Sequence, residues 1–225
     1  MATTVAVARF PGTNCEFDVI EAVESLGGTA ELVFHDSTDL GGADCVVIAG
    51  GFAHGDYLRP GAIARFSPVM GAISSHAADG GAVVGICNGF QVLTESHLLP
   101  GALQKNAGLK FRCAEAALRV ETSDSVLTSQ CSVGDVLSIP INHFEGNFTC
   151  SKETLAELRS EDRIVLRYLE NPNGSVDDIA GICNEGRNVV GLMPHPERAC
   201  HPLLGSTDGV AMFESLLASP LSRAS

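Results

Sequence analysis

The sequence has 225 residues, of which 45% are hydrophobic and 18% are charged, so the chain is long enough and apolar enough to bury a core of its own. Its 14 basic and 27 acidic residues give a formal net charge of -13, which argues against sequence-independent nucleic-acid binding, because such binding draws on clustered Lys and Arg. No apolar run is long enough to span a bilayer, and the opening MATTVAVARF lacks the regions of a signal peptide. We therefore expect a cytoplasmic protein with no membrane or nucleic-acid partner.

The sequence contains eight cysteines. In a reducing compartment, free cysteines usually pack as small buried hydrophobic side chains. No two of them have the Cys-x-x-Cys spacing of a zinc site, and we expect no metal on this chain. A chemical role for any one cysteine therefore needs further support from its surroundings.

Apolar runs alternate with amphipathic segments through the first half of the chain. We predict strands at 4–10, 29–34, 45–49 and 82–86. We predict helices between 13 and 26, from 61 to 76 and from 88 to 98. Thr13 and Glu16 have the spacing of a capping box at the start of the first helix.

The second half is richer in strands. We predict them at 109–120, 136–141, 164–169, 179–183 and 189–193, with helices at 152–160 and 208–219 and a turn at 171–174. The alternation of the first half predicts an α/β fold, an open and mostly parallel sheet flanked by helices, with the additional strands in the second half. We expect one domain over residues 1–225, with its site at the carboxyl ends of the strands.

One such strand end carries a cysteine between two glycines. Gly85-Ile86-Cys87-Asn88-Gly89 has the form of a nucleophile elbow, a sharp strand-to-helix turn that exposes the nucleophile. A side chain at either glycine would clash in such a turn, and the helix N-terminus favours a thiolate and offers N–H groups to an oxyanion. The alternative is a core cysteine in a tight turn.

A cysteine nucleophile needs an imidazole, and seven histidines are available. His195 stands out because it follows the predicted strand 189–193 within Pro194-His195-Pro196-Glu197. Prolines favour an extended chain, in which residues two apart point to the same side, so Glu197 can orient His195 as the third member of a triad. The alternative is a proline-rich surface loop with an ordinary ion pair.

A second oxyanion donor is expected beside the elbow. Gly50-Gly51-Phe52 follows the predicted strand 45–49 and could offer the N–H of Gly51 or of Phe52. A simple loop is the alternative here. Taken together, the three segments predict an enzyme that transfers an acyl group through a cysteine.

With these residues the sequence resembles the class I (triad) glutamine amidotransferases, whose fold is flavodoxin-like. More narrowly, it resembles the family of glutaminase subunits of phosphoribosylformylglycinamidine synthases. The resemblance covers nearly the whole chain and is carried by FPGTNCE (10–16), GGF (50–52), GDYLR (55–59), GICNGFQ (85–91), LLPGAL (98–103), NPNGS (171–175), IAGI (179–182) and GLMPHPER (191–198). FPGTNCE and NPNGS are the segments that narrow the resemblance to this family of glutaminase subunits.

The resemblance implies a role for each matching residue. Cys87 would attack the side-chain carboxamide of glutamine, and His195, oriented by Glu197, would move the protons. The N–H groups of Asn88 and of Gly51 or Phe52 would hold the oxyanion. Further residues implied to grip glutamine are Gln91 and the backbone near His143 and Phe144.

The resemblance also implies partners. Ammonia released into water becomes ammonium, which is not a nucleophile, so a synthetase subunit would receive it and aminate formylglycinamide ribonucleotide in purine synthesis, often with a small accessory subunit. The chain lacks a Gly-x-x-x-x-Gly-Lys-Ser/Thr loop, so ATP and Mg are expected on that synthetase, and no cofactor is expected here. Tyr57, Leu58 and Arg59 are candidate docking residues.

Two positions depart from the pattern of the family. Phe148 stands where the family usually has Tyr, and Pro60 replaces a commoner alanine. Two other functions stay open from the residues themselves. One is a stand-alone cysteine amidase or γ-glutamyl hydrolase on the same fold, and the other is a non-catalytic regulatory subunit.

Overall fold

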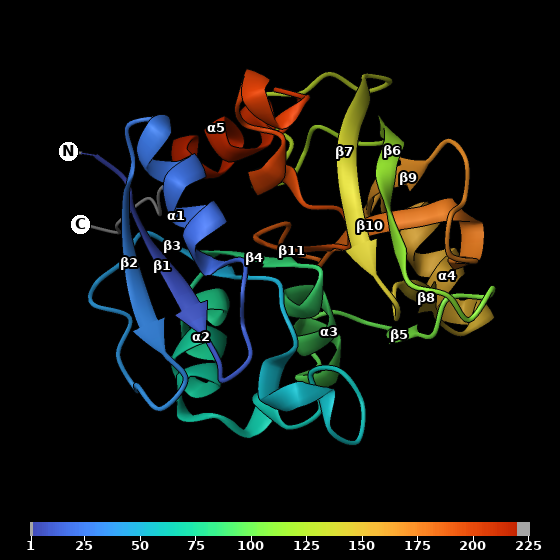
Figure 1. Cartoon of the computed structure of the whole chain (residues 1–225). Coiled ribbons are helices and arrows are strands. Elements are labelled where there is room, and N and C mark those ends of the chain that lie inside the picture. Colours follow the sequence, from blue (N-terminus) through green and yellow to red (C-terminus); the bar gives the residue numbers. More distant parts are fainter. Residues whose placement is uncertain (1, 220–225) are drawn as a thin grey trace.

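The computed structural model describes residues 2–219, in which nine strands form one sheet in the order β2-β1-β3-β4-β11-β10-β9-β6-β7 (Figure 1). The strands are β1 (Thr4–Arg9), β2 (Thr29–Phe34), β3 (Cys45–Ile48), β4 (Ala82–Ile86), β6 (Arg112–Val120), β7 (Val136–His143), β9 (Ile164–Tyr168), β10 (Ile179–Cys183) and β11 (Val189–Leu192). The α-helices are α1 (Glu16–Ser25), α2 (Pro68–Ala78), α3 (Asn88–Glu95), α4 (Lys152–Ser160) and α5 (Val210–Ala218).

The first five strands in this order run parallel. Every residue of β3 and β4 is buried, as expected of strands covered on both faces. Figure 1 shows α1 and α5 on one face of these strands and α2 and α3 on the other. The α/β class and the flanking helices are confirmed.

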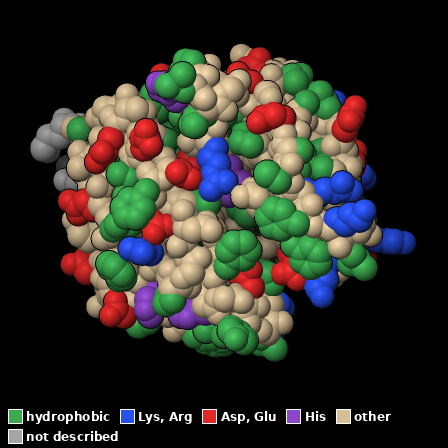
Figure 2. All heavy atoms as spheres, in the orientation of Figure 1, with side chains coloured by type: hydrophobic (Ala, Val, Ile, Leu, Met, Phe, Trp, Pro, Cys, Tyr) green, Lys and Arg blue, Asp and Glu red, His purple; other side chains and the backbone are tan. Residues whose placement is uncertain are grey.

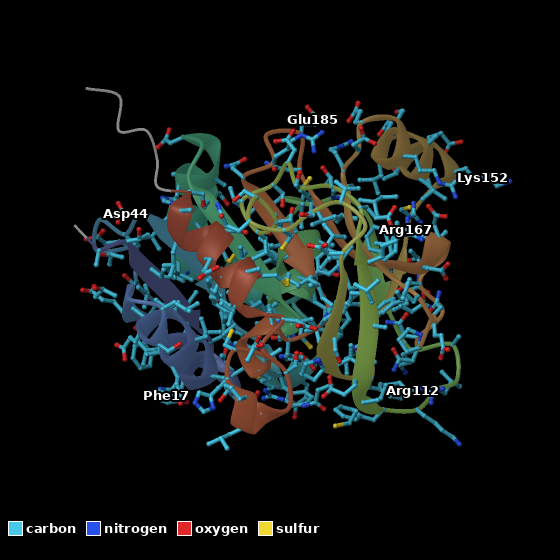
Figure 3. All side chains as sticks on the ribbon, turned by 90° about the horizontal axis from the view of Figure 1, so that it is seen from above. Phe17, Asp44, Arg112, Lys152, Arg167 and Glu185 are labelled. Carbon is cyan, nitrogen blue, oxygen red and sulfur yellow. The ribbon has the colours of Figure 1, made fainter. Side chains whose placement is uncertain are left out.

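The remaining strands pair antiparallel, from β11 with β10 to β6 with β7. Seen from above in Figure 3, Asp44 marks the parallel end of the molecule and Arg167 and Lys152 mark the antiparallel end. Strand β11 lies at the junction and is parallel to β4, with Leu192 opposite Ile86. The residues that follow these two strands are therefore neighbours, although about a hundred positions separate them in sequence.

A small second sheet of β5 (Ala102–Gln104) and β8 (Asn147–Thr149) was not predicted. Each strand has three residues, too few for the period-two pattern to identify. Phe148 in β8 is fully buried, and its ring stacks on Phe90 of α3 at a centroid distance of 5.8 Å. The phenylalanine that departs from the family pattern is thus a core residue, and its ring does not line the catalytic cavity.

Three local predictions are wrong. The capping box does not form, because the Thr13 hydroxyl accepts from the Phe10 N–H and Glu16 pairs with Arg9 at 2.9 Å. The helix expected over 61–76 is divided into a 3-10 helix, η2 (Ala64–Phe66), and α2, because Pro68 starts a new helix. Helix α3 ends at Glu95, before the predicted 98.

The core follows the predicted apolar runs. One hydrophobic cluster extends over both halves of the sheet and includes Val7, Val47, Val84, Leu118 and Ile182. Within residues 2–219, no helix is both long enough and apolar enough to cross a bilayer.

Candidate active site

Cys87 occupies a strained turn between β4 and α3. Its φ of 52° and ψ of −105° are rare for a residue with a side chain, as a nucleophile elbow requires. A Cβ on Gly85 would lie 2.6 Å from the backbone of Gly89, and a Cβ on Gly89 would lie 2.0 Å from the Ile48 carbonyl oxygen. The two glycines therefore permit the turn, and the elbow geometry is present.

His195 and Glu197 form a buried pair directly after β11. The His195 Nδ1 lies 2.6 Å from the Glu197 Oε1, and the two residues are 2% and 3% exposed. The His195 backbone N–H donates to the carbonyl of Pro140, and Glu197 lies in the 3-10 helix η4 (Pro196–Arg198). These contacts fix the imidazole with its other nitrogen, Nε2, unpaired within the described residues.

The imidazole lies beside the cysteine. Gly50 packs between them, and a Cβ there would be 2.9 Å from His195 Cε1 and 3.5 Å from Cys87 Cβ. Burial alone lowers the pKa of His195, but the negative charges of Glu197 and of a Cys87 thiolate outweigh it and hold this pKa well above its ordinary value of 6.5. The raised pKa favours an imidazolium beside Cys87, and an adjacent imidazole is what activates a cysteine nucleophile.

The hydrogen bonds of the loop after β3 distinguish the two predicted donors, the N–H groups of Gly51 and Phe52. The Phe52 N–H donates to the Gly12 carbonyl at 2.9 Å, while the N–H groups of Asn14 and Cys15 donate to Gly50. Thr13 and Gly51 face each other in this short bridge. Among residues 2–219, the Gly51 N–H has no hydrogen-bond acceptor, and Asn88 is the first residue of α3, where a helix leaves N–H groups without an intrahelical partner. Of the two predicted alternatives, Gly51 has the available donor, and Phe52 contributes its half-exposed ring to the cavity wall.

A cavity of about 360 Å³ opens above Cys87. Its lining brings together residues from the predicted set and others. The predicted residues are Gly51, Phe52, Cys87, Gln91, His143 and His195, and the others are Asn14, Cys15, Asp56, Lys105, Asn142, Phe144 and Glu145. Glu197 and Asn88 are buried and do not belong to this lining.

The side chains of Asn88 and Gln91 are held within the protein. Asn88 Nδ2 donates to Gln91 Oε1 at 2.8 Å, and Gln91 Nε2 donates to the Glu145 carbonyl at 2.6 Å. Asn88 Oδ1 accepts from the Ala53 N–H. The predicted contact of Gln91 with glutamine remains a prediction, and its observed contacts position the Glu145 loop.

His143 is buried at the edge of the cavity, and its pKa is lowered to about 3 by burial and by the nearby charge of His195. The ring is therefore neutral. Its Nε2 lies 3.1 Å from the Asn173 amide nitrogen, which can only donate, so the ring proton sits on Nδ1. Asn173 belongs to the NPNGS segment, and this contact gives the segment a structural role, which is to hold the His143 ring.

Cys15 was not predicted as a site residue, although it belongs to the FPGTNCE segment. It is buried beneath the His195–Glu197 pair, with ligand atoms of the three residues all within 4.8 Å of one another. The Arg198 guanidinium donates to the Cys15 Sγ at 3.1 Å, and its positive charge opposes a cation at this position. The segment braces the Gly50–Phe52 loop, a role that no spacing in the sequence signals.

Comparisons with known proteins agree with this geometry. Residues 2–211 match the family model of the CobB/CobQ-like glutamine amidotransferase domain. A phosphoribosylformylglycinamidine synthase subunit PurQ of Rubrobacter xylanophilus is 56% identical over 214 residues, which are 95% of this chain and 97% of that relative. The chain belongs to the PurQ family of glutamine amidotransferases.

Other PurQ relatives are similarly close. The subunit of Koribacter versatilis is 53% identical over 96% of this chain and 98% of its own length. A chain in the solved structure of PurLQS from Thermotoga maritima has a TM-score of 0.90 at 40% identity, covering 97% of this chain and 99% of that one. The class I glutamine amidotransferase fold expected from the sequence is confirmed.

Proposed function

We propose that this chain is the glutaminase subunit of a phosphoribosylformylglycinamidine synthase. It hydrolyses glutamine to glutamate and ammonia and passes the ammonia to a synthetase subunit. The observation that carries the proposal is the Cys87 elbow beside the buried His195–Glu197 pair, in a chain of the PurQ family. A regulatory subunit without catalysis would not need a strained cysteine next to an imidazolium.

The geometry supports a two-step reaction. The Cys87 thiolate attacks the carboxamide carbon of glutamine, and the N–H groups of Asn88 and Gly51 hold the oxyanion. The C–N bond then breaks as His195 gives its proton to the leaving nitrogen, which departs as ammonia. A water molecule adds to the thioester while His195 takes its proton, and cleavage of the C–S bond releases glutamate and restores Cys87.

The ammonia must reach its acceptor before it meets bulk water. The PurQ relatives are named as subunits of the synthase, and the matching Thermotoga maritima structure is named PurLQS, a name that joins PurQ with PurL and PurS. We propose a synthetase partner that holds ATP and Mg, with a small accessory subunit, in the cytoplasm. The continuous core of residues 2–219 supports one domain for this chain.

An exposed apolar surface suits such docking. Figure 2 shows hydrophobic side chains spread over the face that carries the loop between β3 and α2. Tyr57 and Leu58 in this loop are 75% and 85% exposed, close in sequence to Phe52 at the cavity wall. Arg59 makes a two-bond ion pair with Glu95 of α3 and anchors the loop, so Tyr57 and Leu58 are the better docking candidates.

The test compares two nitrogen sources in the assembled synthase. Cys87→Ala should abolish glutamine-dependent synthesis and leave ammonium-dependent synthesis intact, whereas Cys113→Ala, at an exposed thiol, should leave both intact. Glutamine-dependent synthesis by Cys87→Ala would contradict the proposal. Hydrolysis by the free chain with no gain from a synthetase would instead favour the stand-alone hydrolase, and failure of a glutamine-like electrophile to label Cys87 would favour the regulatory subunit.

A further inference from the structure

Two carboxylates line the catalytic cavity without an assigned role. Asp56 ends the 3-10 helix η1 (Ala53–Asp56), and Glu145 lies in the loop between β7 and β8. Both line the same cavity as Cys87, and 89 positions separate them in sequence, from 56 to 145. Their meeting is a product of the fold.

The first turn of α3 ties the two together. Asn88 Nδ2 donates to Asp56 Oδ1 at 3.2 Å and to Gln91 Oε1 at 2.8 Å. Gln91 in turn donates to the Glu145 carbonyl. Because Asn88 directly follows the nucleophile, these contacts fix both carboxylate-bearing segments one side chain away from Cys87.

Neither carboxylate has a cationic partner within 4.0 Å in residues 2–219. Burial and, after it, the charge of Glu145 raise the pKa of Asp56 to about 6, although the Asn88 hydrogen bond offsets part of the rise. Two like charges that face one cavity destabilise the empty chain and favour an incoming cation. Lys105 is the lone Lys or Arg in the cavity lining, and its ammonium lies near the Phe144 ring, 6.0 Å from the centroid.

The backbone of Asp56 adds to this. Its φ is 53°, and His54 and Leu58 on either side also have positive φ, at 53° and 71°. Positive φ is uncommon for a residue with a side chain, although Asp and His adopt it more readily than most. This run of positive φ values shapes the loop that places Asp56 in the cavity lining.

We propose that Asp56 and Glu145 bind the α-ammonium group of glutamine and so select a free amino acid as the substrate. This rests on the proposed glutaminase function, since glutamine has its carboxamide at Cys87 and its ammonium at the other end. Lys105, the one Lys or Arg that lines the cavity within residues 2–219, would receive the α-carboxylate. An amide without the α-ammonium leaves the two carboxylates uncompensated and binds less well.

The test uses 4-carbamoylbutanoate, which is glutamine without its amino group, in the assembled synthase. Asp56→Asn is the informative variant, because Asn tolerates positive φ and keeps the shape while losing the charge. We expect it to lower kcat/KM for glutamine about 10- to 100-fold, the range of a charge-assisted hydrogen bond. The same variant should change kcat/KM for 4-carbamoylbutanoate by less than about twofold, because this substrate has no ammonium group for Asp56 to bind. Glu145→Gln should act in the same direction.

Glu185→Gln is the matched control. It removes one exposed carboxylate in the turn before β11, across the molecule from Phe17 and Arg112 in Figure 3. It should leave both substrates unaffected. If Asp56→Asn lowers kcat/KM equally for both substrates, or if the native protein uses both equally well, the ammonium site is refuted. If the native complex uses neither while ammonium still supports synthesis, the glutaminase proposal itself fails.

Discussion

Replacing Glu197 by Gln isolates the contribution of its charge to catalysis. The carboxylate is fully buried, and its Oε1 accepts from the His195 Nδ1 at 2.6 Å. A carboxamide keeps the shape and one acceptor, but the hydrogen bond loses its charge. Hydrogen bonds to charged groups contribute about 1.5–3 kcal/mol and neutral ones about 0.5–1.5 kcal/mol, so the imidazolium loses roughly 1–2 kcal/mol.

This loss corresponds to about a 5- to 30-fold lower kcat for glutamine-dependent synthesis, since about 1.4 kcal/mol is a factor of ten. If the new amide turns its NH2 toward Nδ1, the ring adopts the wrong tautomer and the loss is larger. The charge of Glu197 also supports the raised pKa of His195, so its removal lowers this pKa. The alkaline limb of the pH–rate profile should therefore move to lower pH.

The assay is steady-state synthesis by the assembled complex with glutamine, and with ammonium as the control for folding and docking. Glu185→Gln, far from the cavity, controls for the change in net charge. A kcat within about twofold of the native value, together with an unmoved pH profile, would refute the role of Glu197 in orienting and charging His195.

Two further predictions concern stability. Gly89→Ala would place a Cβ 2.0 Å from the Ile48 carbonyl oxygen, and because that oxygen belongs to buried backbone, we expect a loss of roughly 2–4 kcal/mol in urea unfolding. An unchanged midpoint would contradict the close packing of the elbow. Asp56→Asn should stabilise the isolated chain, because the folded-state pKa of about 6 lies above the ordinary 3.8, so that ionisation of Asp56 penalises the folded protein increasingly between pH 3.8 and about 6 and fully above that. The full shift corresponds to roughly 3 kcal/mol, which solvent screening of this half-exposed group reduces to about 1 kcal/mol. Urea unfolding at pH 8 should detect the gain, and it should vanish below about pH 4; a gain that does not depend on pH would contradict this origin.

Much of the fold was predictable because β-branched apolar runs identify buried strands. The runs at 45–49, 82–86 and 189–193 are strands β3, β4 and β11, which surround the site. The errors arise where tertiary contacts override a local pattern. Thr13 and Glu16 have capping-box spacing, but their side chains bond elsewhere. Strands β5 and β8 exist only by pairing with each other.

The candidate site likewise contains residues that local patterns predicted and residues that only tertiary contacts place. Cys87, His195 and Glu197 have local signatures, a glycine-flanked elbow and a His-Pro-Glu segment, and the structure brings them together. The choice between Gly51 and Phe52 depended on a bridge to the Gly12–Asn14 segment, which spacing does not reveal.

The sequence did not indicate that Asp56 and Glu145 line one cavity, because their positions depend on tertiary contacts through Asn88 and Gln91. Asp56 does belong to the GDYLR segment quoted for the family resemblance. That segment indicated docking through Tyr57, Leu58 and Arg59, and it did not indicate that Asp56 beside them lines the cavity.

The central claim is that Cys87 forms a thioester with glutamine, and trapping this intermediate tests it most directly. The assembled complex is mixed with glutamine, quenched in acid within the first turnovers, digested and analysed by mass spectrometry. We predict a glutamyl adduct on the peptide that contains Cys87 and none on the peptide that contains Cys15, the other thiol lining the cavity. An adduct on Cys15, or turnover of glutamine with no adduct on Cys87 at any quench time, would contradict the account.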